Sequence, residues 1–203
     1  MNLKFRRKKI IYSILLFLFT IVLFFCFSIY INRNQVYPTT HEKHELNVFF
    51  QNKDIQSSKD IIYVQNKLID EIKHEFVSSK QLSIDRTLNL KKGFCYDRSL
   101  VLQKYFLMKG FKIRPVFLYW QGTNTKVLDF FKKNVNSHNI FELFFDGNWY
   151  VIRTNTKMEK LENIKEYLNS GVSIPKHTRY IRYLNNRNGN FLYPSYLPDI
   201  YFF

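Results

Sequence analysis

The chain has 203 residues, a formal net charge of +15 and two cysteines. Once an apolar N-terminal segment is set aside, this length fits one domain. Since Cys26 lies in that segment, the remaining Cys95 excludes a domain held together by internal disulfides. The positive charge would suit acidic lipids, acidic polymers or nucleic acid. The joint abundance of Lys, Asn, Ile, Phe and Tyr is also what a compositionally biased genome produces, so charge identifies no partner.

The first 31 residues have the pattern of a retained membrane anchor. A basic flank at 1–9 carries five Lys and Arg and no acid, and 22 uncharged residues follow at 10–31. As a helix this apolar stretch would be roughly 33 Å long, enough to cross a bilayer, and no small-residue cleavage site ends it. We therefore expect a transmembrane signal anchor at 10–31 in contact with membrane lipid. The N-terminus would be cytoplasmic and the domain extracytoplasmic, as in a single-pass membrane protein.

A spacer at 32–58 and a folded domain at 59–203 are predicted to follow the anchor. Within the spacer, His41 and His44 are three residues apart, whereas the zinc-protease motif needs four. The chain also shows no calcium loop and no nucleotide motif. We expect no metal and no cofactor.

The first half of the domain is predicted to be helical. Apolar residues recur three and four apart over 61–76, which predicts an amphipathic helix. Residues 83–92 are predicted to be a polar connection. A second, more apolar helix is expected at 96–109, with Gly110 as its C-terminal stop.

The pattern then changes to that of strands. Residues 112–120 predict a strand, which Pro115 would place at an edge or make irregular, and a long loop follows at 121–137. Strands at 139–145 and 149–153 flank Asp146-Gly147, a hairpin turn signal, and a short helix is expected at about 158–168.

The tail at 171–203 interleaves basic and aromatic residues, a combination that can hold single-stranded nucleic acid. In an external domain these aromatics are better explained as strands that complete the core. This location disfavours nucleic acid as a partner.

Cys95 and His138 are the candidate chemical groups. Cys95 would lie in the first turn of the helix, where free N–H groups and the helix dipole, with Lys91 and Lys92 upstream, would lower the thiol pKa. Gly93 would leave room for a substrate carbonyl, and the Cys95 N–H could bind an oxyanion. His138 opens a strand, from which an imidazole could act as base.

These residues resemble a known family. The run Gly93-Phe94-Cys95-Tyr96-Asp97, the helix end 107–111, the strand carrying Arg114 and Val116, and the segment 138–151 are similar to the transglutaminase-like core. The resemblance covers about 85–155 and not the tail. It implies a papain-like α+β fold, in which the nucleophile helix packs on an antiparallel sheet. It also implies acyl chemistry on amides, namely hydrolysis, transfer or crosslinking, with Cys95 as nucleophile and His138 as base.

The chain departs from the family at the third catalytic position. The family usually places an aspartate four residues after the hairpin tryptophan, and Arg153 occupies that place here. A carboxylate there would orient the imidazole, whereas a guanidinium cannot accept a hydrogen bond. Asn155, or Thr154, could take this role if the strand register slips, and the same slip would turn Arg153 away.

Three interpretations remain open. The first is a bacterial-type, membrane-anchored thiol enzyme that acts outside the cytoplasm on a peptide or amide substrate, such as a protein or a cell-wall crosslink. The alternative is a catalytically degenerate binding domain, as Arg153 would suggest. The third is a tethered assembly protein, for which the aromatic tail is the only indication.

Overall fold

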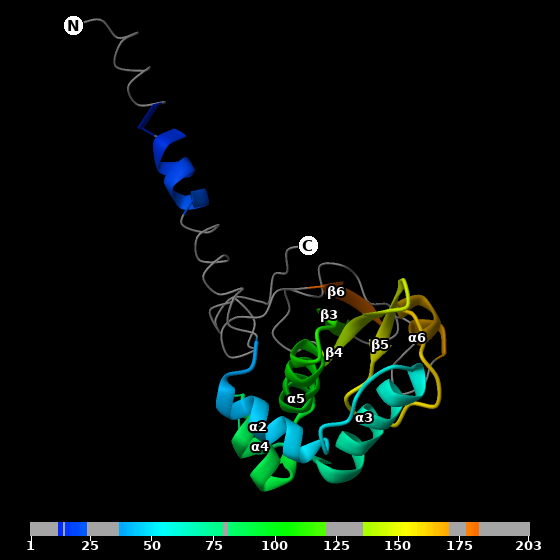
Figure 1. Ribbon diagram of the computed structural model, residues 1–203. Coiled ribbons are helices and arrows are strands. Elements are labelled where there is room, and N and C mark those ends of the chain that lie inside the picture. Colours follow the sequence, from blue (N-terminus) through cyan, green and yellow to red (C-terminus); the bar gives the residue numbers. More distant parts are fainter. Residues whose placement is uncertain are drawn as a thin grey trace, which may run out of the picture.

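The computed structural model describes residues 12–13, 15–23, 37–78, 81–120, 136–170 and 178–182. Its helices outside the N-terminal segment are α2 (Thr40–Phe49), α3 (Ser58–Glu71), α4 (Ile84–Leu90), α5 (Cys95–Met108) and α6 (Ile164–Ser170). The strands are β1 (Lys73–His74), β2 (Lys92–Gly93), β3 (Lys112–Trp120), β4 (Asn136–Phe145), β5 (Asn148–Ile152) and β6 (Arg179–Arg182). The fold is therefore mixed α and β, as predicted (Figure 1).

A four-stranded antiparallel sheet, in the order β5-β4-β3-β6, forms the centre of the domain. One face packs on the helices at 40–108, and Phe106 of α5 meets Phe141 of β4 with ring centroids 6.0 Å apart. The other face packs on α6, with Ile140 of β4 against Ile164 and Tyr167. Because both faces are covered, β4 is apolar on both, and the helix that begins at Cys95 lies on an antiparallel sheet as expected.

The structure confirms the predicted hairpin turn at Asp146-Gly147 and the predicted helix end at Gly110. Asp146 and Gly147 join β4 to β5 with φ values of 46° and 75°, the pair of positive values that a two-residue type I′ hairpin requires. Gly110 follows α5 with φ of 86°. The left-handed conformation there is what a glycine permits at low cost.

The predicted helix at 61–76 is one turn too long. Ile61, Val64, Leu68 and Ile72 are fully buried as the spacing indicated, but α3 ends at Glu71 and Phe76 is 62% exposed. The chain becomes extended at Ile72 because Lys73 and His74 pair in parallel with Lys92 and Gly93. This pairing places β1 beside the residues that precede Cys95.

Two helices lie where the sequence indicated no structure. The connection at 83–92 contains α4, whose N-cap Ser83 accepts a hydrogen bond from the Arg86 N–H; seven residues are too few to show a clear period. Part of the predicted spacer forms α2. Leu46 and Phe50 are fully buried there, and Glu42 accepts a 2.6 Å hydrogen bond from Lys104 of α5.

Pro115 did not make β3 an edge strand, because β3 lies between β4 and β6. The proline pairs with Phe141 of β4, and pairing with β6 runs only from Val116 to Tyr119. The missing N–H of Pro115 therefore removes no bond to β6 in the part of the chain that the structure describes.

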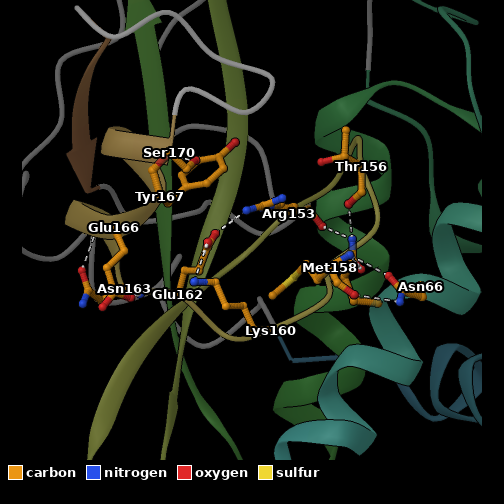
Figure 2. Close-up of polar contacts among 11 residues, drawn as sticks. Asn66, Arg153, Thr156, Met158, Lys160, Glu162, Asn163, Glu166, Tyr167 and Ser170 are labelled. Atoms are coloured by element: carbon orange, nitrogen blue, oxygen red, sulfur yellow. Dashed lines mark hydrogen bonds and ion pairs between the residues drawn. The ribbon is translucent and has the colours of Figure 1, made fainter.

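The last described helix starts later than expected, at Ile164 instead of near 158. Asn163 caps it by accepting from the N–H groups of Lys165 and Glu166. The preceding segment is instead tied to α3, since the Met158 N–H donates to Gln65 and Asn66 (Figure 2).

The N-terminal residues 12–13 and 15–23 are helical. Across the described ranges, no helix combines the length and apolar character of a membrane span. The predicted span at 10–31 lies partly outside those ranges, as do most of the predicted loop at 121–137 and most of the tail at 171–203.

Candidate functional site

Cys95 is the first residue of α5, and Asp97 organises the turn around it. One carboxylate oxygen of Asp97 accepts a 2.8 Å hydrogen bond from the Phe94 N–H, and the other accepts a 2.7 Å bond from the Leu82 N–H. The first bond satisfies a free donor at the helix start. The second ties α5 to the segment that leads into α4, so the position of Cys95 is set by a fully bonded, buried carboxylate.

Gly93 is required for a different reason from the one expected. It lies in β2 opposite His74. A Cβ at this position would be 2.9 Å from the Asp97 Cβ and 3.2 Å from the Thr87 Cγ2. The absent side chain therefore lets Asp97 pack closely against the strand, and Asp97 and Thr87 fill the space that a Cβ at Gly93 would enter.

The thiol of Cys95 is buried and neutral. Its exposed fraction is 5%. Burial raises its pKa, although the N–H groups of Asn139, Tyr96 and Cys95 itself face the sulfur and oppose this effect. The predicted lowering of the thiol pKa is thus wrong in sign, because desolvation outweighs the helix terminus. The upstream lysines add little, since Lys91 and Lys92 pair with Glu71 and Glu75 at 3.6 and 2.9 Å.

His138 is a buried residue of β4 whose ring is held by Thr154. The ring Nε2 lies 3.3 Å from the Thr154 Oγ1, and the same hydroxyl donates a 2.7 Å hydrogen bond to the Asn139 carbonyl. A hydroxyl has only one proton to donate, so towards the ring Thr154 must accept. Nε2 therefore carries the proton, and Nδ1 keeps a free lone pair with which it can act as a base.

Burial also keeps the His138 ring neutral. Its pKa is lowered to about 4, first by desolvation and then by the nearby His74 and Arg98, against a smaller raising effect of a hydrogen-bonding contact with Asn155. The resting pair is consequently a thiol and a neutral imidazole, and not a thiolate and an imidazolium.

The third position of the site is occupied by Thr154, with Asn155 beside it. Asn155 acts on the ring, but its Oδ1 is buried and meets no donor at full hydrogen-bond geometry, so its contact is looser than that of Thr154. The segment after β5 is held in place by Gln65 of α3, whose amide donates to the carbonyls of Arg153 and Thr156 at 3.0 and 2.8 Å.

Arg153 points away from the ring. Figure 2 shows its guanidinium directed at Glu162, with which it forms an ion pair, and the guanidinium carbon lies 5.1 Å from the centre of the Tyr167 ring. The residue at the family's aspartate position is therefore part of the packing between β5 and α6.

Two residues near the thiol were not singled out from the sequence. Arg98 lies three residues after Cys95 on α5, a spacing that places two side chains on one helix face, and this signal could have identified it. His74 stacks on Phe94 with ring centroids 4.9 Å apart. It reaches this place only through the pairing of β1 with β2, for which the sequence has no signal.

The structure brings Cys95 and the His138 strand together through Asn139, whose backbone N–H faces the sulfur. Among the described contacts of these two residues, the ring bonds to Thr154 and not to the thiol. A catalytic hydrogen bond often tightens only when substrate is bound. The arrangement is thus a buried thiol, a neutral base with one unprotonated nitrogen, and helix N–H groups directed at the sulfur.

No protein-family model matches the chain, and no curated protein matches its sequence. Two of the solved structures that the chain matches have TM-scores below 0.5. One is an arylamine N-acetyltransferase from Bacillus cereus, described as having a Cys-His-Glu catalytic triad, with 14% identity, a TM-score of 0.42 and coverage of 58% of this chain and 49% of that one. The other is a proposed cysteine protease from Cytophaga hutchinsonii, with 14% identity, a TM-score of 0.46 and coverage of 83% and 58%. The chain thus spans about half the length of the proteins it matches.

Proposed function

We propose that this protein is a thiol enzyme that cleaves or transfers acyl groups at amide bonds, with Cys95 as nucleophile and His138 as base. The observation that supports this function best is the state of His138. A buried, neutral ring with Nε2–H held by Thr154 and Nδ1 unprotonated is the form that can take a proton from a nearby thiol.

In the proposed reaction the Cys95 sulfur attacks the amide carbonyl carbon and its proton passes to Nδ1 of His138. The N–H groups at the start of α5 stabilise the oxyanion that forms. The C–N bond then breaks, and the imidazolium returns the proton to the leaving amine. The thioester on Cys95 is finally attacked by water, which gives hydrolysis, or by a second amine, which gives transfer. The substrate would be a peptide or another amide, in a protein or a cell-wall crosslink.

The alternative is a binding domain that has lost catalysis. It is favoured by the observation that no carboxylate among the described residues contacts the ring, since Arg153 pairs with Glu162 instead. In that case the buried thiol would be inert.

Activity measurements on single variants distinguish the two. On peptide nitroanilides, in a Cys26→Ser background, we expect Cys95→Ala to abolish turnover and His138→Gln to reduce it by about a hundredfold or more, while Thr154→Val costs about tenfold through the loose ring. Thr156→Val is the matched control, because the buried Thr156 hydroxyl has no partner; its rate should stay near that of the parent. Turnover that survives Cys95→Ala contradicts the assignment of Cys95 as nucleophile.

We also propose that residues 10–31 anchor the protein in a membrane with the domain outside the cytoplasm. The basic flank at 1–9 and the uncharged stretch after it support this topology. The full chain should remain with membranes after alkaline carbonate washing and should be released when 1–31 are deleted. Alkaline phosphatase fused to the C-terminus, which is active only outside the cytoplasm, should be active. An inactive fusion that is well expressed would reverse the orientation.

A further inference from the structure

Arg98 is a buried cation for which no ion pair is found among the described residues. Its side chain is 1% exposed, and its Nε is fully buried and has no hydrogen-bond partner. Among the described residues no carboxylate forms an ion pair with it. The neighbouring Asp97 does not pair with Arg98, and its two oxygens accept instead from the N–H groups of Leu82 and Phe94.

A buried guanidinium with no counter-ion destabilises the folded protein when no ligand is bound. Desolvation lowers the pKa of Arg98 to about 10, which leaves the guanidinium charged at neutral pH. A buried charge without a counter-ion destabilises a fold. Elsewhere in α5 a buried cation does have a counter-ion, since Lys104 pairs with Glu42 at 2.6 Å. The uncompensated charge at Arg98 therefore indicates a group that is supplied from outside.

The charge lies at the candidate site. Arg98 interacts electrostatically with the Cys95 sulfur, and its charge lowers the pKa of both His138 and His74. None of these three groups is an anion in the resting site, because the thiol and the His138 ring are neutral. The N–H groups at the start of α5 face the same place, and a helix N-terminus favours negative charge. Two independent features thus attract an anion beside the sulfur.

We infer that Arg98 binds a carboxylate of the substrate, next to the amide bond that Cys95 attacks. This inference rests on the proposed function, which it deepens by naming the class of substrate: an amide with a carboxylate close to the scissile bond, such as an acidic residue or a free α-carboxylate in a peptide. A planar guanidinium matches a carboxylate through two parallel hydrogen bonds. A single cation between neutral groups balances one negative charge, which favours a carboxylate over a doubly charged phosphate.

The test compares two alkylating reagents of nearly equal size, anionic iodoacetate and neutral iodoacetamide. With each, the sulfur attacks the methylene carbon, a C–S bond forms and iodide leaves. The full chain carrying Cys26→Ser is used, and modification of Cys95 is followed by mass spectrometry. Because the same thiol reacts at the same pH, the ratio of the two rates cancels the thiolate fraction and reports the charge beside the sulfur.

We expect the iodoacetate-to-iodoacetamide ratio of the folded chain to exceed that of the same chain unfolded in urea by at least about tenfold. Arg98→Met should bring the ratio back to the unfolded value, and Arg98→Lys should retain part of the excess. Lys73→Met, which removes an exposed charge from β1 beside the site, should leave the ratio unchanged and controls for the loss of one cation.

Equal ratios in the folded and unfolded chain would overturn the inference, even if Arg98→Met does not fold. Acetate should slow the iodoacetate reaction of the folded chain more than inorganic phosphate does at matched ionic strength; stronger protection by phosphate would overturn the carboxylate assignment. The alkylation rates can be measured whether or not the chain has amidase activity. If the folded chain shows the excess in the alkylation ratio but no amidase activity, the proposed function fails and the anion site stands. If the chain is an active amidase but shows no excess, the anion site fails and the proposed function stands.

Discussion

Replacement of Glu162 by alanine is expected to lower the free energy of unfolding by about 3–5 kcal/mol, because it leaves the Arg153 guanidinium buried without its counter-ion. The side chains of Arg153 and Glu162 are 11% and 10% exposed. Among the described residues, the other cation paired with Glu162 is Lys160, which is 76% exposed and 3.7 Å away, so it holds the carboxylate weakly. Urea unfolding of the full chain would measure the loss.

Two control variants test whether the loss of stability comes from the buried, unpaired charge. In Arg153→Met/Glu162→Met both charges are absent, and the double variant should be more stable than Glu162→Ala, since apolar pairs of similar volume often replace buried ion pairs at little cost. Asp70→Ala breaks an exposed pair with Lys157, in which both side chains are 56% exposed; this change should cost less than about 1 kcal/mol. A loss for Glu162→Ala as small as that for Asp70→Ala would contradict the buried pair.

Acidification from pH 6.5 to pH 4 is expected to remove on the order of 3 kcal/mol of stability through His138 alone. The pKa of the ring is about 4 in the folded chain and 6.5 when it is exposed. Between these values the unfolded chain binds the proton and the folded chain does not, so the stability present above pH 6.5 falls as the pH falls. The lowered pKa of His74 acts in the same direction, whereas the raised pKa of Asp97 acts in the opposite one.

Urea unfolding at pH 7, 5.5 and 4.5 would measure this dependence. His138→Gln should flatten the slope between pH 6.5 and 4, because the titrating group is gone. His44→Gln, which removes an exposed histidine from α2, should leave the slope as it is. A slope that is equally steep in His138→Gln would show that other groups cause the acid lability.

The elements with a clear period were predicted well. The apolar spacing in α3, the run of apolar residues in α5 and the Asp146-Gly147 turn each reflect contacts within a few residues of sequence, and the structure confirms them. The helix α2 was missed because Leu46 is its one buried residue, which gives no apolar period, and α4 was missed because it has only seven residues. Their burial depends on α5, since Lys104 and the Asp97 carboxylate bind groups from those segments.

In the candidate site, too, local features were predicted correctly and features that depend on tertiary packing were not. Cys95 at a helix start and His138 in a strand were deduced from local pattern, and the structure places both accordingly. The direction of the pKa shift of the Cys95 thiol was predicted wrongly, because it depends on burial that no local pattern reveals. The three-residue spacing from Cys95 in α5 could have identified Arg98, but what makes this residue noteworthy is that its buried Nε has no hydrogen-bond partner among the described residues.

The sequence by itself determined two local elements, a helix that starts at a cysteine and a strand that carries a histidine. Both follow from short-range periodicity and turn residues. Only the tertiary structure decided what surrounds them. The direction of a side chain near the end of a strand depends on what packs there, and in this protein Gln65, Glu162 and Tyr167 hold Arg153 away from the ring. Thr154 is thereby left to bind His138, and the chemistry of Cys95 depends on this choice between neighbouring residues.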